Sequence, residues 1–435
     1  MHLLFSPELK LALRPSGVIP GARVQTVKAP LPRHWQLRLM PTAKSDSIWT
    51  RTFLLLCSAQ FLGYAQHAVL TPVLPLYVTH LGGSALMVGL VLAAFAATSV
   101  IVRPLVGHWA DRWNEAGVMI LGLLFQGATI FICFVPFVSA AMLANALRGI
   151  GWAGLNTGGY SLLAHTAPEA RRGEASGLYS GFQSASAILF PAFALWLLQV
   201  TVGGFTAVFV ASALFSFAGA GLGVLMAHSL PHAASREAAS ERSPQWWREI
   251  FHFIERDILL PSIILFWLNL SLPSITNFSV LYARDLGILN FGTFFVALGL
   301  TSLLGRPLLG RLSDRFGRDR SVAAGFVLQL AALLLISTVA NLFGMIIAGA
   351  FYMMGNALGS STTLALAVER ADPRRRGKAM ATFSVAYPLS YGVGSLITGT
   401  AVEAAGYTGM FLVLAAVQGL GLIFALINAT NLRSQ

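Results

Sequence analysis

Two side chains that can carry charge lie inside long apolar runs of this sequence. Arg148 falls within the run 140–165, and His67 lies near the middle of the run 52–78. A charge in apolar surroundings costs free energy, so an arginine there is a candidate for function, and imidazole side chains titrate close to neutral pH. We therefore expect His67 and Arg148 to bind a substrate and to couple its movement to a proton. Two structural alternatives stay open: a neutral imidazole bonded to a neighbour such as Gln66, and a guanidinium held by helix-end carbonyl groups.

Further polar residues recur at helical spacing in four of the apolar runs. Residues at i, i+4, i+7 and i+11 share one face of a helix, and the first run has such a face in Gln60, Tyr64, His67 and Thr71. Similar faces are predicted for Asn145, Arg148, Trp152 and Asn156, for Tyr352, Asn356, Ser360 and Thr363, and for the amide pair Asn269 and Asn277. A pocket between these faces suits an anionic, zwitterionic or amphipathic small molecule better than a simple cation, because nothing in it would neutralise a cation's charge.

Acidic residues are missing from the middle of the apolar runs. All 17 Asp and Glu residues lie in the predicted tail, loops, linker or ends of the runs. A carboxylate buried among apolar residues can bind a proton in one conformation and release it in another, and here that role is vacant. The nine histidines show no metal-ligand spacing, and the sequence has no GxxxxGK[ST] nucleotide-binding motif. We therefore expect no metal, no cofactor, no ATP-driven step and no enzymatic activity.

The overall composition indicates the elements that must hold these residues. The chain is 56% hydrophobic and 11% charged, with a mean hydropathy of +0.70, which exceeds what a soluble protein of 435 residues could bury. Twelve apolar runs reach roughly the 20 residues needed to cross a bilayer: 52–78, 85–107, 116–138, 140–165, 173–199, 204–228, 258–283, 289–311, 320–339, 342–368, 377–402 and 408–430. The prediction is an all-α membrane protein with twelve transmembrane helices.

The sequence repeats itself in two halves. The segment RPLVGHWADR at 103–112 returns 203 residues later as RPLLGRLSDR at 306–315. A repeat of this length is a duplicated domain, which predicts two pseudo-symmetric six-helix bundles at 51–228 and 257–430. The polar stretch 229–256 is the predicted linker, residues 1–50 are a predicted disordered basic tail, and residues 431–435 are a short C-terminal tail.

The positions of the positive charges predict how this topology is oriented. All Lys and Arg residues other than Arg148 and Arg284 fall on one side of it, and Arg284 stands alone on the other. Positive charge marks cytoplasmic loops, so both termini and the linker are expected to be cytoplasmic. The net charge of +12 is then expected to contact anionic lipid headgroups and not nucleic acid.

The repeated loops could form a gate on the cytoplasmic side. Glycine lets two helices approach closely, and a carboxylate at a helix end can pair with an arginine or cap a neighbouring helix. We expect gate contacts from Gly107, Asp111, Arg112, Gly310, Asp314 and Arg315. The alternative is that these charges are solvated and only fix the topology.

These features together resemble the major facilitator superfamily, most closely its bacterial drug- and sugar-efflux branch. Residues 310–320 match the family's cytoplasmic signature Gly-x-x-x-Asp-Arg-x-Gly-Arg-Arg/Lys nearly completely, whereas Trp113-Asn114-Glu115 replaces the end of the signature in the first half. Residues 148–154 keep the arginine of a second signature, Arg-x-x-x-Gly-x-Gly. The antiporter signature Gly-x-x-x-Gly-Pro-x-x-Gly is kept only as Phe190-Pro191-Ala192.

The resemblance implies a secondary active transporter in which the first, fourth, seventh and tenth spans line a cavity between the two bundles. The leading hypothesis is proton-coupled efflux of drugs or metabolites by an alternating-access antiporter, with His67 and Arg148 as coupling residues. Uptake of an organic anion or sugar by a facilitator or symporter is the alternative. An integral-membrane enzyme is a third hypothesis, which the lack of acidic residues within the spans disfavours, and a sensor that binds without transporting is a fourth. In each case we expect a monomer in the inner or plasma membrane, with the lipid bilayer as its surroundings.

Overall fold

The computed structural model describes residues 48–168, 171–229, 255–371 and 376–432. For residues 111, 306, 307, 310–316, 376–378 and 381 it describes the backbone alone. Every regular element in these ranges is a helix, which confirms the predicted all-α fold for this part of the chain. The predicted tail 1–50 and linker 229–256 fall almost wholly outside it, and the domain boundaries stay predictions.

Three helices of the first half begin at residues whose side chains accept hydrogen bonds from free amide groups. Thr50 accepts a hydrogen bond from the amide of Phe53, and Ser84 and Asn114 cap the next helices in the same way. The elements are α3 (Arg51–His80), α4 (Ala85–Ile101), α5 (Arg103–Arg112), α6 (Glu115–Thr129), η2 (Ile130–Phe134), α7 (Val138–Thr166), α8 (Arg172–Val200) and α9 (Phe205–Ala227).

The second half contains two interruptions that matter for the site. After Pro273, residues Ser274–Phe278 form the π-helical turn η5, and Gly406 breaks α16 with a φ of 68°. The elements are η4 (Arg256–Ile258), α11 (Leu259–Asn269), η5, α12 (Ser279–Asp285), α13 (Gly292–Phe316), α14 (Arg318–Thr338), α15 (Leu342–Arg370), α16 (Arg376–Ile427) and α17 (Ala429–Leu432).

Fewer spans are evident than the sequence predicts. In the described part, eight helical segments are long and apolar enough to cross a membrane, or nine when α4 and α5, which meet at 42°, are taken as one bent span. Helix α16 continues across the break at Gly406, so two predicted spans count as one segment. Helix α7 is 29 residues long, but its polar residues lower its hydropathy and it is not counted. An all-helical membrane protein is therefore supported, and the number twelve stays a prediction.

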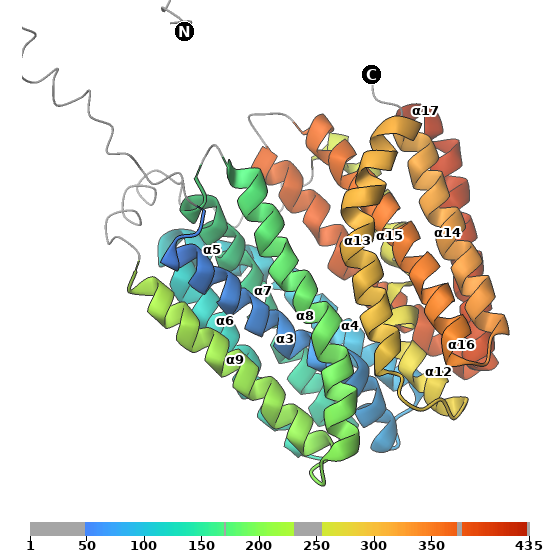
Figure 1. Ribbon diagram of the computed structural model, residues 1–435, viewed down its shortest axis with the longest axis horizontal. Helices are drawn as coiled ribbons and strands as arrows, with labels where there is room; N and C mark the ends of the chain where they lie inside the picture. The colour runs from blue at the N-terminus through green and yellow to red at the C-terminus, as the bar shows by residue number, and fades with distance from the viewer. Residues whose placement is uncertain (1–47, 169–170, 230–254, 372–375, 433–435) are drawn as a thin grey trace, which may run out of the picture. The chain divides into compact units, whose positions relative to one another are not determined.

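The helices pack as two groups that follow the two halves of the sequence (Figure 1). In the first group α3 packs on α7, α8 and α9, and in the second α15 packs on α11, α13 and α14. The same close contact occurs in both groups: a Cβ added to Gly122 would lie 2.6 Å from the carbonyl oxygen of Gly151, and one added to Gly355 would lie 2.6 Å from that of Gly325. Corresponding glycines thus let α6 meet α7 and α14 meet α15, as expected of a duplication.

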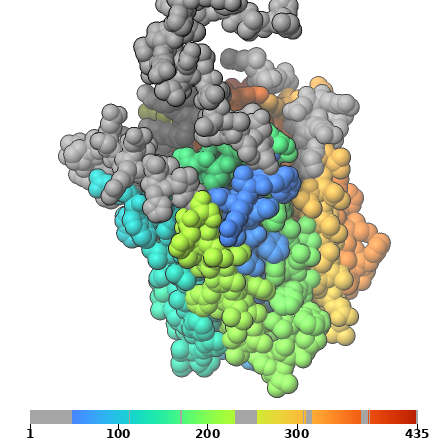
Figure 2. Space-filling model, turned by 60° about the vertical axis from the view of Figure 1, so that its left-hand side comes forward, coloured from blue at the N-terminus to red at the C-terminus, as the bar shows by residue number. Residues whose placement is uncertain are grey.

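Apolar side chains also cover the outside of the two groups. Figure 2 shows one such face, on which α9 lies between α6 and α8. Leu121 and Leu124 on α6 and Leu214 and Leu225 on α9 are each at least 40% exposed. Exposed apolar surface of this extent is typical of a surface that faces lipid.

The two groups share a core on one side and have separate cores on the other. We call the side where α3 begins and α16 ends the near side, and the side of the α3–α4 turn the far side. On the far side one apolar cluster includes residues of both groups, from Leu70 and Val91 to Phe278 and Leu414. On the near side the clusters stay within one group. The groups are therefore joined mainly at the far side.

Candidate functional site

Arg148 lies at the centre of a polar cluster between the two groups. Its side chain is 2% exposed, one guanidinium nitrogen donates to Asn145 Oδ1, and another lies 3.4 Å from Gln66 Oε1 and 3.5 Å from His67 Nδ1. Its Nε atom has no partner, and the ion pairs of the described residues do not include it. A buried guanidinium with only neutral neighbours leaves a positive charge that is not compensated.

Close packing of α4 on α7 holds this arginine in place. Gly149 allows it, because a Cβ there would lie 2.4 Å from the carbonyl oxygen of Phe95. The Asn145 amide donates to the carbonyl of Val91 over 2.7 Å, and the guanidinium carbon lies 5.4 Å from the centre of the Phe95 ring. The ring face attracts the cation and shields it from lipid.

Aromatic rings stack beside the arginine. The His67 and Trp152 rings are parallel within 30° with centroids 4.5 Å apart, and the Tyr64 ring lies tilted against Trp152 with centroids 4.6 Å apart. The Tyr64 hydroxyl donates to Asn156 Oδ1 over 2.7 Å. The predicted faces of the first and fourth spans thus meet in one cluster.

Side chains of the second group close the cluster. Asn277 Nδ2 donates to the carbonyl oxygen of Thr71 over 2.9 Å, and the Tyr391 hydroxyl donates to Asn277 Oδ1. A small cavity lies between them, with His67 and Arg148 also in its wall. Its volume of about 20 Å³ leaves room for one water molecule, so the cluster is closed around its centre in this conformation.

Other predicted site residues lie apart from this cavity. Asn356 Nδ2 donates to Asn269 Oδ1 over 3.1 Å, which forms a separate polar pair in the second group. The Tyr352 hydroxyl lies 2.8 Å from Ser271 Oγ in the interior of that group. Gln60 is fully buried in the first group, where its amide donates to the carbonyl oxygen of Leu155 over 3.0 Å.

The predicted gate is described only in part. The side chains of Asp111, Gly310, Asp314 and Arg315 lie outside the described residues. Gly107 has no atom within 4 Å of an added Cβ, and Arg112 is exposed. The gate therefore stays a prediction.

Described contacts between the groups come from other residues. On the near side Arg103 Nη1 donates to the carbonyl oxygen and the hydroxyl of Ser384, both over 3.2 Å. On the far side the amide of Leu86 donates to Glu403 Oε1 over 3.2 Å. A carboxylate thus meets the positive end of α4 across the two groups.

Sequence reasoning missed two residues of the cluster, Phe95 and Tyr391. Tyr391 continues a polar face at i, i+3 and i+7 with Ser384 and Tyr387 in the eleventh predicted span, and this spacing could have revealed it. Phe95 has no distinguishing sequence signal. Among the described residues no group of His, Cys, Asp and Glu could hold a metal ion.

Comparisons with known proteins agree with this architecture. The family model of the Major Facilitator Superfamily matches residues 56–297 and 259–433. A relative described as an uncharacterised MFS-type transporter, from Methanocaldococcus jannaschii, is 24% identical over 84% of this chain and 92% of its own length. The multi-drug resistance efflux pump PmrA of Streptococcus pneumoniae is 26% identical over 60% of this chain and 66% of the pump.

A solved structure shows the same fold. The bacterial homologue of the human lysosomal transporter Spinster, in an inward-facing and unoccupied conformation, has a TM-score of 0.71 and 16% identity, covering 88% of this chain and 98% of that chain. Since the family model covers most of the sequence, this chain belongs to the Major Facilitator Superfamily.

Proposed function

We propose that this protein exports an amphipathic small molecule, a drug or metabolite, in exchange for protons, by alternating access of two six-helix bundles. The observation that carries the proposal is the closed cluster around Arg148 and His67, to which both groups contribute. The likeness to a multi-drug efflux pump supports the direction of transport. The protein acts as a monomer in the plasma membrane.

The side chains of the cluster divide into two roles. Trp152, Tyr64 and Phe95 supply aromatic surface for an apolar substrate body, and Asn156 and Asn277 supply amides that orient it. His67 is the titratable group of the cluster. A proton on His67 would place a second positive charge about 3.5 Å from the Arg148 guanidinium. The charge of Arg148 therefore opposes protonation of His67, and a charged substrate bound nearby would change how readily His67 binds a proton.

We propose that this arrangement is an inward-facing state in which the central cluster is closed around its centre. The predicted topology assigns nearly all Lys and Arg residues to the near side, so we take this side as the cytoplasmic one. The groups share their core at the far side and have separate cores at the near side. On the near side Tyr160 and Tyr387, which flank the cluster, are about half exposed, at 49% and 48%, as expected if the site opens to the cytoplasm.

Uptake of an organic anion by symport is the second candidate, and the uncompensated charge of Arg148 favours it. An anion would neutralise that charge and would also stabilise a proton on His67, so the two would bind together. For export by exchange, the substrate and the proton must instead exclude each other.

Flux measurements in proteoliposomes test the proposal. We expect a proton gradient to drive fluorescein, an amphipathic anion, faster than ethidium, whose positive charge the cluster would not neutralise, and both His67→Ala and Arg148→Ala to abolish this flux. His228→Ala is the matched control, because His228 is exposed and bonds only a backbone carbonyl one turn earlier. Unchanged flux after collapse of the gradient would exclude proton coupling, and counterflow without any ion gradient would favour uptake.

A further inference from the structure

A second cavity lies on the far side, about as large as a small-molecule site. Its volume is about 820 Å³, within the range of roughly 300–1,000 Å³ found for ligand pockets. We call it the far-side cavity; its walls come from the ends of α3 and α8, the start of α9, α12 and the turn that follows α12. It shares no residue with the wall of the central cavity, so a ligand in one does not occupy the other.

Aromatic and aliphatic side chains form its floor. The Tyr77 hydroxyl donates to the carbonyl oxygen of Cys133 over 2.6 Å, which leaves the ring as an apolar surface. Tyr77 lies 5.2 Å from Phe205 and 4.9 Å from Phe209, measured between ring centroids. Leu76, which also lines the cavity, is 8% exposed. This floor is suited to an apolar ring system or chain.

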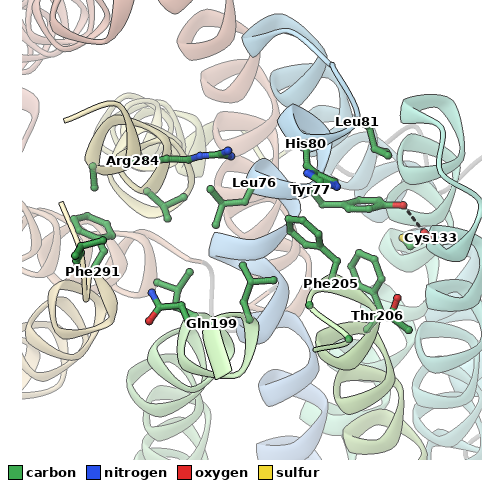
Figure 3. A pocket seen from close by; sticks show the side chains of 18 of the residues that line it. Leu76, Tyr77, His80, Leu81, Cys133, Gln199, Phe205, Thr206, Arg284 and Phe291 are labelled. Carbon is green, nitrogen blue, oxygen red and sulfur yellow. Dashed lines mark hydrogen bonds between the residues drawn. The ribbon is translucent and has the colours of Figure 1, made fainter. Parts of the chain in front are cut away.

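The polar groups of the cavity are neutral or positive. Figure 3 shows Arg284 reaching from its helix toward the wall that carries Leu76 and Tyr77, with His80 on that wall. Among the described residues, no Asp or Glu lines the cavity, and Arg284 takes part in none of their ion pairs. The topology predicted from the sequence also places Arg284 alone, outside the central cluster, away from the near side.

The turns at the rim of the far-side cavity, before α9 and after α12, have unusual backbone conformations. Gly204 and Gly287 have φ values of 48° and 69°, and Asn290 has a φ of 58°. Asparagine is one of the few residues other than glycine that adopt this region readily. The turns at both rims of the cavity are therefore built from residues that tolerate it.

We propose that the far-side cavity is a second binding site, distinct from the central cluster, for an amphipathic organic anion. Its acidic group would bind Arg284, and its apolar body would lie on Tyr77, Phe205 and Phe209. The inference does not depend on transport, because it concerns binding at a place that the proposed substrate site does not include.

Protection of an introduced cysteine tests this proposal. Cys57 and Cys133, both buried, are replaced by alanine, and Thr206→Cys places a thiol in the wall of the cavity. The rate of modification by a membrane-impermeant maleimide is measured with 8-anilinonaphthalene-1-sulfonate and with N-phenyl-1-naphthylamine, which has the same rings without the sulfonate. Thr338→Cys, exposed at the far end of α14, is the matched control outside the cavity.

We expect the anionic probe to slow modification at position 206 and not at position 338. Arg284→Gln should raise the concentration of sulfonate needed for half-protection by at least about tenfold, the loss of one charge-assisted hydrogen bond, whereas Arg284→Lys should keep most of the protection. The melting temperature of each variant reports whether the protein is intact. Equal protection by the two probes, or full protection in Arg284→Gln, would overturn the proposal, as would the absence of protection by either probe.

Discussion

Gly399 lies where α16 meets α4 at the far side, and adding a methyl group there should force the two groups apart. A Cβ at this position would lie 2.6 Å from the carbonyl oxygen of Ala85 and 3.0 Å from the Cα of Leu86. Both are backbone atoms in the first turn of a helix, so neither can rotate away as a side chain could. In the far-side-closed arrangement, the steric clash that Gly399→Ala introduces can be relieved only if α4 and α16 separate.

The expected size of the effect follows from this contact. Overpacking of a well-packed interface costs about 1–3 kcal/mol, and the cost falls only on the conformation that makes the contact. An equilibrium between far-side-closed and far-side-open states should therefore shift by roughly 5- to 150-fold toward the open state. Spin labels at Val202→Cys and Thr338→Cys, both exposed and in different groups on the far side, should show a new population at longer distance.

Gly419→Ala on the same helix is the matched control, because its added Cβ would lie 3.6 Å from the nearest atom of Leu330, an ordinary contact. Its distance distribution should equal that of the parent protein. An unchanged distribution in Gly399→Ala, in protein that melts at the parent temperature, would refute the claim that this contact holds the far side closed.

Three further predictions concern the packing and charges of the same structure. Gly355→Val should lower the melting temperature or abolish folding, because its Cβ would lie 2.6 Å from the Gly325 carbonyl oxygen, whereas Gly305→Val, with 3.5 Å to its nearest neighbour, should be tolerated in the same thermal assay. Arg148→Met should raise the melting temperature by a few degrees while abolishing transport, since it removes a buried charge without an acidic partner; a lower melting temperature would contradict this. Glu403→Ala should raise the population of the far-side-open state by roughly 2- to 5-fold in the spin-label measurement, because it removes about 0.5–1 kcal/mol of stabilisation at the start of α4. An unchanged population would show that this contact contributes nothing.

Helical spacing predicts best the part of the central cluster where α3 and α7 face each other. Periodicity alone predicts Tyr64 and Asn156 on the polar faces of their helices, and the structure joins the two side chains by a hydrogen bond. Gln60 belongs to the same face of α3, but it lies one turn nearer the near side, where Gly159 leaves room for its amide to reach α7. A helix face can therefore be polar along its whole length and still line the central cavity with only some of its residues.

The second half shows why regular spacing can fail. The sequence predicts Asn269 and Asn277 as two amides about two turns apart on a span interrupted by Pro273, and in the structure the π-helical turn η5, which contains Asn277, changes the register after that proline. Asn277 consequently bonds Thr71 of the other group, and Asn269 bonds Asn356 of its own. No periodicity rule for a continuous α-helix anticipates such a turn, although Pro273 marks where the helix is disturbed.

The central claim is that one polar cluster between the two groups opens to one side of the membrane at a time. The most direct test is the reactivity of Thr71→Cys, in protein without Cys57 and Cys133, toward an impermeant maleimide added from either side of oriented vesicles. Alternating access predicts modification from a single side, with the reactive side changing when the proton gradient is reversed. Equal modification from both sides under both gradients would contradict it.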